Sequence, residues 1–312
     1  MSLVLQFLLL VLGFALLVKG ADFFVDGAAG IAKKFGIPDL VIGLTIVAMG
    51  TSAPEAAVSI AGAFKGSADI SIGNVVGSNL LNVLVILGLA AVIIPIAVSV
   101  STVKYEIPFL IAISVLFPIL GMDGTMSRID GIILWICFIA YLIYLFKMAK
   151  NGKEEEESSA KDISIPMALL LTVGGAVMIV FGSDFAVDSA STIARTFGMS
   201  ERFIGLTIVA LGTSLPELFT SVTAARKGNA DIAIGNIVGS NIFNYLFVIG
   251  TSALIIPINF ASNFIVDAII ALAAAVFLWF CVFKDRELAR IGGSAMLIGY
   301  AAYFVYIAFI AV

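Results

Sequence analysis

Two glutamates stand inside long apolar stretches of this 312-residue sequence, where a charged side chain is costly. Glu55 lies within the run from Val41 to Phe64, and Glu217 lies within the run from Phe203 to Ala225. An ionised carboxylate deep in a membrane is unfavourable, and such residues usually mark the path of an ion. Lys and Arg gather outside the apolar runs, so no fixed cation is available to pair with these acids. A mobile cation or a proton must take that place.

Oxygen-bearing groups surround each glutamate in the sequence. Thr51 and Ser52 stand four and three residues before Glu55, which places all three on one face of a helix. Pro54 cannot donate a hydrogen bond to the carbonyl of Gly50, so we expect the helix to break or kink and to free that carbonyl. The same pattern recurs at Thr213, Ser214, Pro216 and Glu217, and the following runs add Ser78 with Asn82 and Ser240 with Asn244.

These groups favour hard cations. Carboxylate, amide, hydroxyl and carbonyl oxygens suit calcium and sodium, and the chain contains no His that could bind a softer metal. Two carboxylates carry a charge that one calcium ion or two sodium ions would neutralise. Competition of the two ions for one site would give exchange directly.

The two glutamates belong to an internal duplication. Shifted by 162 residues, the chain aligns VIGLTIVAMGTSAPE with FIGLTIVALGTSLPE without a gap, and 29 of the 48 pairs between positions 41 and 88 are identical. Each copy has five apolar runs, and an odd number of spans makes the second copy enter the membrane from the opposite side, as in the inverted repeats of secondary transporters. We expect a first repeat at residues 1–146, an acidic inside loop at 147–163 and a second repeat at 164–312.

Composition places the chain in a lipid bilayer. Its mean hydropathy is +1.16 and 61% of its residues are hydrophobic. A helix needs roughly 20 residues to cross a hydrocarbon core of about 30 Å, and the runs are continuously apolar rather than alternating, so the fold class is all-α integral membrane with ten transmembrane helices. The expected spans are approximately Leu3–Leu17, Val41–Phe64, Ile70–Ile96, Ile107–Leu120, Ile129–Leu145, Ile165–Phe181, Phe203–Ala225, Ile232–Ile258, Phe264–Phe283 and Ile291–Val312.

The basic residues give the orientation. With the amino terminus outside, the inside loops hold twelve Lys and Arg and the outside loops hold four. Inside loops carry the excess of positive charge, so both termini are expected outside. The short loops favour the plasma or inner membrane of a prokaryotic cell. We expect no nucleic-acid partner and no resident cofactor, and a monomer, with an oligomer left open.

The paired motifs GTSAPE with GNVVGSN and GTSLPE with GNIVGSN resemble the two alpha-repeats of the calcium:cation antiporter superfamily, in particular its sodium/calcium exchanger type. The resemblance implies alternating access, in which the first spans of each half slide across a central bundle that holds the ions. Asn244 stands where several such exchangers have Asp, so the coupling ion stays open between sodium and a proton. The resemblance implies an ion site lined by Thr51, Ser52, Glu55 and the Ala48 carbonyl, by Thr213, Ser214, Glu217 and the Ala210 carbonyl, and by Ser78, Asn82, Ser240 and Asn244.

Other classes of function compete with sodium/calcium antiport. A proton/calcium antiporter could use the same two glutamates as proton carriers. A cation channel fits less well, because channels usually form one pore from symmetric subunits. An enzyme is not expected, since the chain has no His for a Ser-His protease and no pair of intramembrane Asp residues.

Two further acidic pairs lie outside this scheme. Asp22 with Asp26, and Asp184 with Asp188, are spaced four residues apart and are expected near helix ends. One interpretation is that they are solvated capping residues. The other is that they guide ions toward the site.

Overall fold

The chain folds almost entirely into helices. The computed structural model describes residues 3–64, 69–151, 163–198 and 210–309. The first copy of the duplication contains α1 (Leu3–Phe35), α2 (Asp39–Ile42), η1 (Gly43–Val47), α3 (Ala48–Thr51), α4 (Ala53–Phe64), α5 (Asp69–Leu80), η2 (Leu81–Leu87), α6 (Gly88–Ile93), η3 (Thr102–Glu106), α7 (Ile107–Leu120) and α8 (Arg128–Asn151), where η denotes a π-helical segment. The second copy contains α9 (Ile165–Thr196), α11 (Ala210–Thr213), α12 (Leu215–Arg226), α13 (Ala230–Phe243), η5 (Asn244–Ile249), α14 (Gly250–Ile255), α15 (Ser262–Val282) and α16 (Arg290–Phe309).

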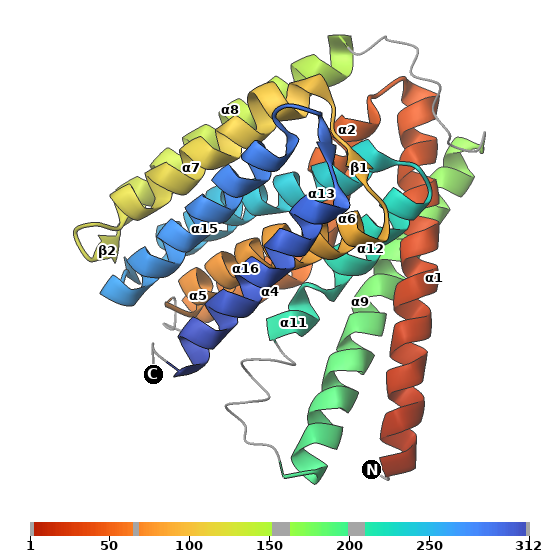
Figure 1. Ribbon diagram of the computed structural model, residues 1–312, viewed down its shortest axis with the longest axis horizontal. Coiled ribbons are helices and arrows are strands. Elements are labelled where there is room, and N and C mark those ends of the chain that lie inside the picture. The colour runs from red at the N-terminus through yellow and green to blue at the C-terminus, as the bar shows by residue number, and fades with distance from the viewer. Residues whose placement is uncertain (1–2, 65–68, 152–162, 199–209, 310–312) are drawn as a thin grey trace.

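Helices α1 and α9 run side by side along one flank of the molecule (Figure 1). The expected spans begin where these helices begin, at Leu3 and Ile165, but they end at Leu17 and Phe181, whereas both helices continue well beyond those points. Their backbones approach so closely that a Cβ atom on Gly182 would lie 2.8 Å from the Gly13 carbonyl oxygen. Glycine at this position therefore lets the two helices pack against each other.

The acidic residues of α1 lie inside the helix, not near its end as expected. Lys227 follows α12, and its ammonium group donates to Asp26 Oδ1 at 2.7 Å and to the main-chain oxygen of Asp22 at 2.7 Å. The same group lies 3.5 Å from Asp22 Oδ1. This pairing ties the middle of α1 to the end of α12.

The helices that carry the two glutamates are broken, as the prolines predicted. The helical stretch Asp39–Thr51 and helix α4 meet at an angle of 51°. Ser52 stands at the break with ψ of 8°, and Ser214 stands between α11 and α12 with ψ of 3°, so both leave helical geometry just before a proline.

The centre of the fold is formed by α13 and the π-helical segments η2 and η5. Residues Ala230–Ile255 are almost wholly buried, and Figure 1 shows α12 and α13 between the α1/α9 pair and helices α7 and α8. Single π-helical segments inside α-helices are often found at functional sites, because the extra residue redirects side chains. Asn82 lies in η2, and Asn244 begins η5.

Within the described ranges, seven helices are long and apolar enough to cross a membrane, and the bent pair of Asp39–Thr51 with α4 would add an eighth. Helix α16 is not among the seven, and the expected span at 203–225 begins outside the described residues. Helix α8 continues to Asn151, into the expected inside loop, whose residues 152–162 also lie outside the described ranges. The count of ten spans stays a prediction.

Two small antiparallel sheets join the copies at their helix ends. β1 (Ile96–Ala97) pairs with β4 (Glu287–Leu288), and β2 (Thr125–Met126) pairs with β3 (Ile258–Asn259). A shift of 162 residues turns one sheet into the other, since Ile96 corresponds to Ile258 and Thr125 corresponds to Glu287. Each sheet therefore contains one strand from each copy.

Candidate ion-binding site

The two glutamates lie together at the centre of the fold. Glu55 is in the first turn of α4 and Glu217 is in the first turn of α12, and each is only 1% exposed. The positive end of each helix dipole faces its own carboxyl group. The two carboxyl groups are close enough to interact electrostatically. Because like charges repel in a buried place, the pair favours a cation or a proton.

Each glutamate lies beside hydroxyl groups of the other copy. Ser52 Oγ donates to Glu217 Oε1 at 2.7 Å, and Thr51 also lies next to Glu217. Thr213 lies next to Glu55. The site is therefore built across the copies, and neither copy contains it alone.

Several predicted ligand oxygens have no hydrogen-bond donor among the residues that the structure describes. All of them are buried, and a buried acceptor without a partner is costly. A bound cation would supply the missing partner. These atoms are Oε1 and Oε2 of Glu55, Oε2 of Glu217, Oδ1 of Asn82, Oδ1 of Asn244 and Oγ of Ser214.

Four asparagines form a pseudo-symmetric cluster beside the glutamates. The side-chain amides of Asn79 and Asn241 each donate to the other residue's main-chain oxygen, at 3.3 and 3.1 Å. Asn82 donates to Asn241 Oδ1 at 2.9 Å, and Asn244 donates to Asn79 Oδ1 at 3.0 Å. These bonds fix the amide nitrogens of Asn82 and Asn244, so their unpartnered oxygens are left to accept from elsewhere.

The helix contacts bring this cluster to the glutamates. Helix α12, with Glu217, packs against η2, which carries Asn82. Helix α4, with Glu55, packs against η5, which carries Asn244. Each carboxyl group therefore lies on a helix that contacts the asparagine-bearing segment of the other copy.

A second layer of amides positions the main chain around the site. Asn236 Nδ2 donates to Ser221 Oγ at 2.8 Å, and Asn236 Oδ1 accepts from Thr51 Oγ1 at 3.0 Å. Asn74 Nδ2 donates to Ser59 Oγ at 2.9 Å and to the Glu55 main-chain oxygen at 3.2 Å. Sequence reasoning missed Asn74, Asn79, Asn236 and Asn241, although each is identical in the two copies, which is the signal that could have found them.

The remaining predicted residues lie on helices that contact those of the glutamates. The Ala48 carbonyl accepts from Ser240 Oγ at 3.3 Å, which joins α3 to α13. Ser78 is buried on α5. Ala210 is the first residue of α11, and its side chain lies outside what the structure describes.

Known proteins are similar to this chain in sequence and in fold. The family described as sodium/calcium exchanger protein matches the chain twice, over residues 5–147 and 167–309. The chain belongs to the sodium/calcium exchanger family. The prediction from the paired motifs is therefore confirmed.

Relatives of this exchanger-family chain match along most of its length. Inner membrane protein YrbG of Escherichia coli (strain K12) is 36% identical, covering 83% of this chain and 84% of its own. Sodium/calcium exchanger MaX1 of Methanosarcina acetivorans is 33% identical, covering 99% of this chain and 100% of its own. A solved structure of the sodium-calcium exchanger NCX_Mj, soaked with 10 mM Na+ and zero Ca2+, has a TM-score of 0.85 at 33% identity, covering 99% of this chain and 100% of that chain.

Membership of the exchanger family confirms the coarse predictions. The chain is an all-helical, multi-pass membrane transporter of the exchanger class, and it is not an enzyme. Calcium and sodium are the ions that fit this family.

Proposed function

We propose that this protein exchanges Ca²⁺ for Na⁺ across a cell membrane at one site formed by Glu55 and Glu217. The observation that carries the proposal is the set of six buried, unpartnered oxygens contributed by both copies. Oxygen ligands from carboxylates, amides and a hydroxyl are those that Ca²⁺ and Na⁺ prefer. One calcium ion balances both carboxylates, and sodium ions replace it when they fill the same ligands.

The ligand set of this site is the one predicted from the sequence. Hydroxyls of Thr51, Ser52, Thr213 and Ser214 surround the acids, and the carbonyls of Ala48 and Ala210 border them. The amide oxygens of Asn82 and Asn244, with the hydroxyls of Ser78 and Ser240, complete the oxygen ligands. The breaks at Ser52 and Ser214 support this arrangement, because they place both hydroxyls directly before the helices that carry the acids.

The two copies form inverted five-helix repeats, and together they make ten spans. The two family matches, over residues 5–147 and 167–309, coincide closely with the proposed repeats at 1–146 and 164–312, and the acidic loop 147–163 joins the repeats on the inside. Both termini then face outward, in the plasma or inner membrane, and one chain holds a complete site. Alternating access follows if α1 and α9 move as a pair across the bundle that carries the site.

The test is transport by purified protein in liposomes. Sodium-loaded vesicles diluted into sodium-free buffer with calcium should accumulate calcium, and Glu55→Gln or Glu217→Gln should each abolish uptake, because one charge of the pair is lost. Glu106→Gln is the matched control. Glu106 is also 1% exposed, but its carboxyl group accepts from Tyr144 away from the site, so uptake should persist.

Two other results would replace the proposal. Calcium uptake driven only by a pH gradient would identify a proton/calcium antiporter that uses the same acids. Calcium flow down its own gradient, with no counter-ion, would identify a channel.

A further inference from the structure

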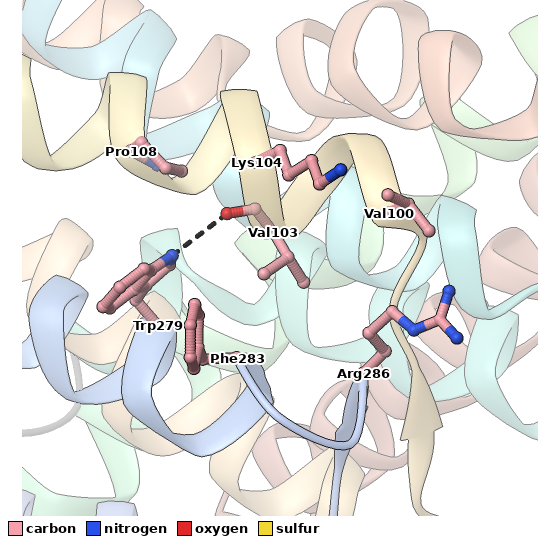
Figure 2. Close-up of a pocket in the computed structure, with 7 residues that line it drawn as sticks. All are labelled: Val100, Val103, Lys104, Pro108, Trp279, Phe283 and Arg286. Carbon is pink, nitrogen blue, oxygen red and sulfur yellow. Dashed lines mark hydrogen bonds between the residues drawn. The ribbon is translucent and has the colours of Figure 1, made fainter.

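A pocket of about 330 Å³ lies between the start of α7 and the end of α15, away from the ion site (Figure 2). Val103 and Trp279 form much of its apolar wall, and Trp279 Nε1 donates to the Val103 carbonyl at 3.0 Å, which fixes the ring. Figure 2 shows the Lys104 ammonium and the Arg286 guanidinium at one end of the pocket. The aromatic rings lie at the other end. The pocket thus joins a cationic end to an apolar slot.

The backbone of Arg286 is in an unfavourable conformation. Its φ is 53°, and no other non-glycine residue in the described ranges has a positive φ. A side chain in this region crowds the backbone, so such an outlier calls for a functional reason.

The first copy shows that the turn itself does not need an arginine. Gly124 is the residue 162 positions earlier, and its φ is 89°. The Arg286 carbonyl accepts from the Val98 amide at 2.8 Å, and the Gly124 carbonyl accepts from the Phe260 amide at 2.9 Å, so the two turns make the same bond. Glycine satisfies this geometry without strain. The guanidinium group, rather than the turn, is therefore what residue 286 provides.

The corresponding place in the other half lacks the two cations. Val266 corresponds to Lys104, and Gly121 corresponds to Phe283. A Cβ atom on Gly121 would lie 2.5 Å from the Phe260 ring, which also packs edge-on against Phe117 at 5.3 Å. The Phe260 ring therefore lies where the side chain of residue 121 would stand, and both cations belong to only one of the two equivalent places.

We propose that this pocket binds an anionic phospholipid. Lys104 and Arg286 would hold the phosphate, and an acyl chain would lie along Val103, Trp279 and Phe283. Within the part of the chain that the structure describes, neither cation forms an ion pair, so both charges are available. Basic pockets between helices at the cytoplasmic face suit anionic headgroups, and Trp favours the interface. The proposed topology places the pocket in the inside leaflet. Lipid binding itself does not depend on which ions are transported.

The test replaces the two cations of the pocket with the residues at the equivalent positions of the other copy. Wild-type protein and the variant Lys104→Val/Arg286→Gly, which carries the residues of the other copy, are titrated in neutral detergent with phosphatidylglycerol or phosphatidylcholine, and bound lipid is counted by native mass spectrometry. Wild type should retain phosphatidylglycerol in preference to phosphatidylcholine, and the variant should bind it about tenfold or more weakly, since two surface cations are lost. The control Lys284→Val/Arg290→Ala removes two charges from the same end outside the pocket lining, and its binding should match wild type.

Several outcomes would overturn the lipid site. These are equal binding of the two lipids, unchanged binding in the pocket variant, equal weakening in the control, or displacement of phosphatidylglycerol by millimolar inorganic phosphate, which would indicate a free-anion site. The single variants Lys104→Val and Arg286→Gly are measured as well, so that the proposal remains testable if the double variant does not fold. Sodium-driven calcium uptake in the same preparations separates failure of this site from failure of the ion site.

Discussion

The two copies match closely at the centre of the molecule and diverge at the ends of their helices. In the asparagine cluster, every bond from one copy has a counterpart from the other, as for Asn82 to Asn241 and Asn244 to Asn79. At the hairpins, Gly124 is replaced by Arg286, and the two cations of the pocket belong to only one of the two equivalent places. Under the proposed exchange, the ion site is reached from both sides of the membrane, which favours equivalent halves at the centre. The helix ends lie at two membrane faces with different surroundings, so they can differ.

The match at the centre is not complete in this structure. Glu217 receives the Ser52 hydroxyl, whereas neither oxygen of Glu55 has a donor among the described residues. Ser183 Oγ donates to the Gly212 carbonyl at 2.8 Å, and the corresponding residue of the first copy is Ala21, which cannot donate. The hydrogen bonds around the two glutamates are therefore not equivalent in the two halves.

Breaking the asparagine cluster should have the largest effect after loss of the glutamates. Asn241→Ala leaves Asn82 Nδ2 and the Asn79 main-chain oxygen without their partners, and Asn79→Ala does the same in the other half. Each polar group left unpaired costs about 1–3 kcal/mol of unfolding free energy. Thermal unfolding in detergent and calcium uptake should both fall strongly, and by equal amounts in the two variants.

Ser294→Ala provides the control for that test. The Ser294 hydroxyl donates only to the Arg290 carbonyl on the exposed side of α16, so its loss should leave both measurements near wild type. A large difference between Asn79→Ala and Asn241→Ala would show that the two halves of the cluster are not equivalent.

The paired variants Ser52→Ala and Ser214→Ala sharpen the comparison within the centre. Ser52 donates to a carboxyl group at 2.7 Å, whereas Ser214 Oγ has no partner among the described residues. A hydrogen bond between buried side chains contributes about 0.5–1.5 kcal/mol. Without ions, Ser52→Ala should therefore lower the unfolding temperature clearly and Ser214→Ala should change it little.

Calcium should stabilise the two variants by similar amounts. Both hydroxyls are proposed ligands, so both variants should weaken calcium affinity to a similar degree when binding is measured by calorimetry. Equal destabilisation without ions would contradict the asymmetry seen here, and unequal loss of calcium affinity would contradict a shared site.

The sequence was sufficient to predict that the two glutamates and their neighbouring hydroxyls meet at the centre. The glutamates, the hydroxyls before them and the proline breaks follow rules of local chemistry, and the structure places Glu55 and Glu217 together after bends. The supporting role of Asn79 and Asn241 depends on which main-chain oxygens face each other across the copies. That information is tertiary, so no local pattern contains it.

The ends of the long helices were the least predictable part of the fold. The polar residues after Leu17 look like the end of a membrane span, yet α1 continues through them. In α1 these residues meet Lys227, more than two hundred residues away in sequence, which contacts Asp22 and Asp26. A pairing at that separation cannot be read from a hydropathy pattern. The pocket at Lys104 and Arg286 was not predicted for the same reason, because its residues come from both copies.

The contact of Lys227 with α1 gives the smallest expected effect and tests how the halves move. If α1 slides past the bundle during exchange, the bond from Lys227 to Asp26 at 2.7 Å holds it in the present arrangement. The pair is partly exposed, and such ion pairs contribute about 0–1 kcal/mol, so Lys227→Met should shift the balance between arrangements by about fivefold at most.

That shift should appear as a change in the sodium concentration for half-maximal exchange, with the maximal rate nearly kept. The difference between wild type and Lys227→Met should also decrease as ionic strength rises, because salt screens the exposed ion pair of the wild type. Lys19→Met is the matched control, since Lys19 lies 3.9 Å from Asp22 within α1 itself and does not connect α1 to α12. An equal effect of both variants would mean that the charge of Asp22 matters and the contact between the helices does not.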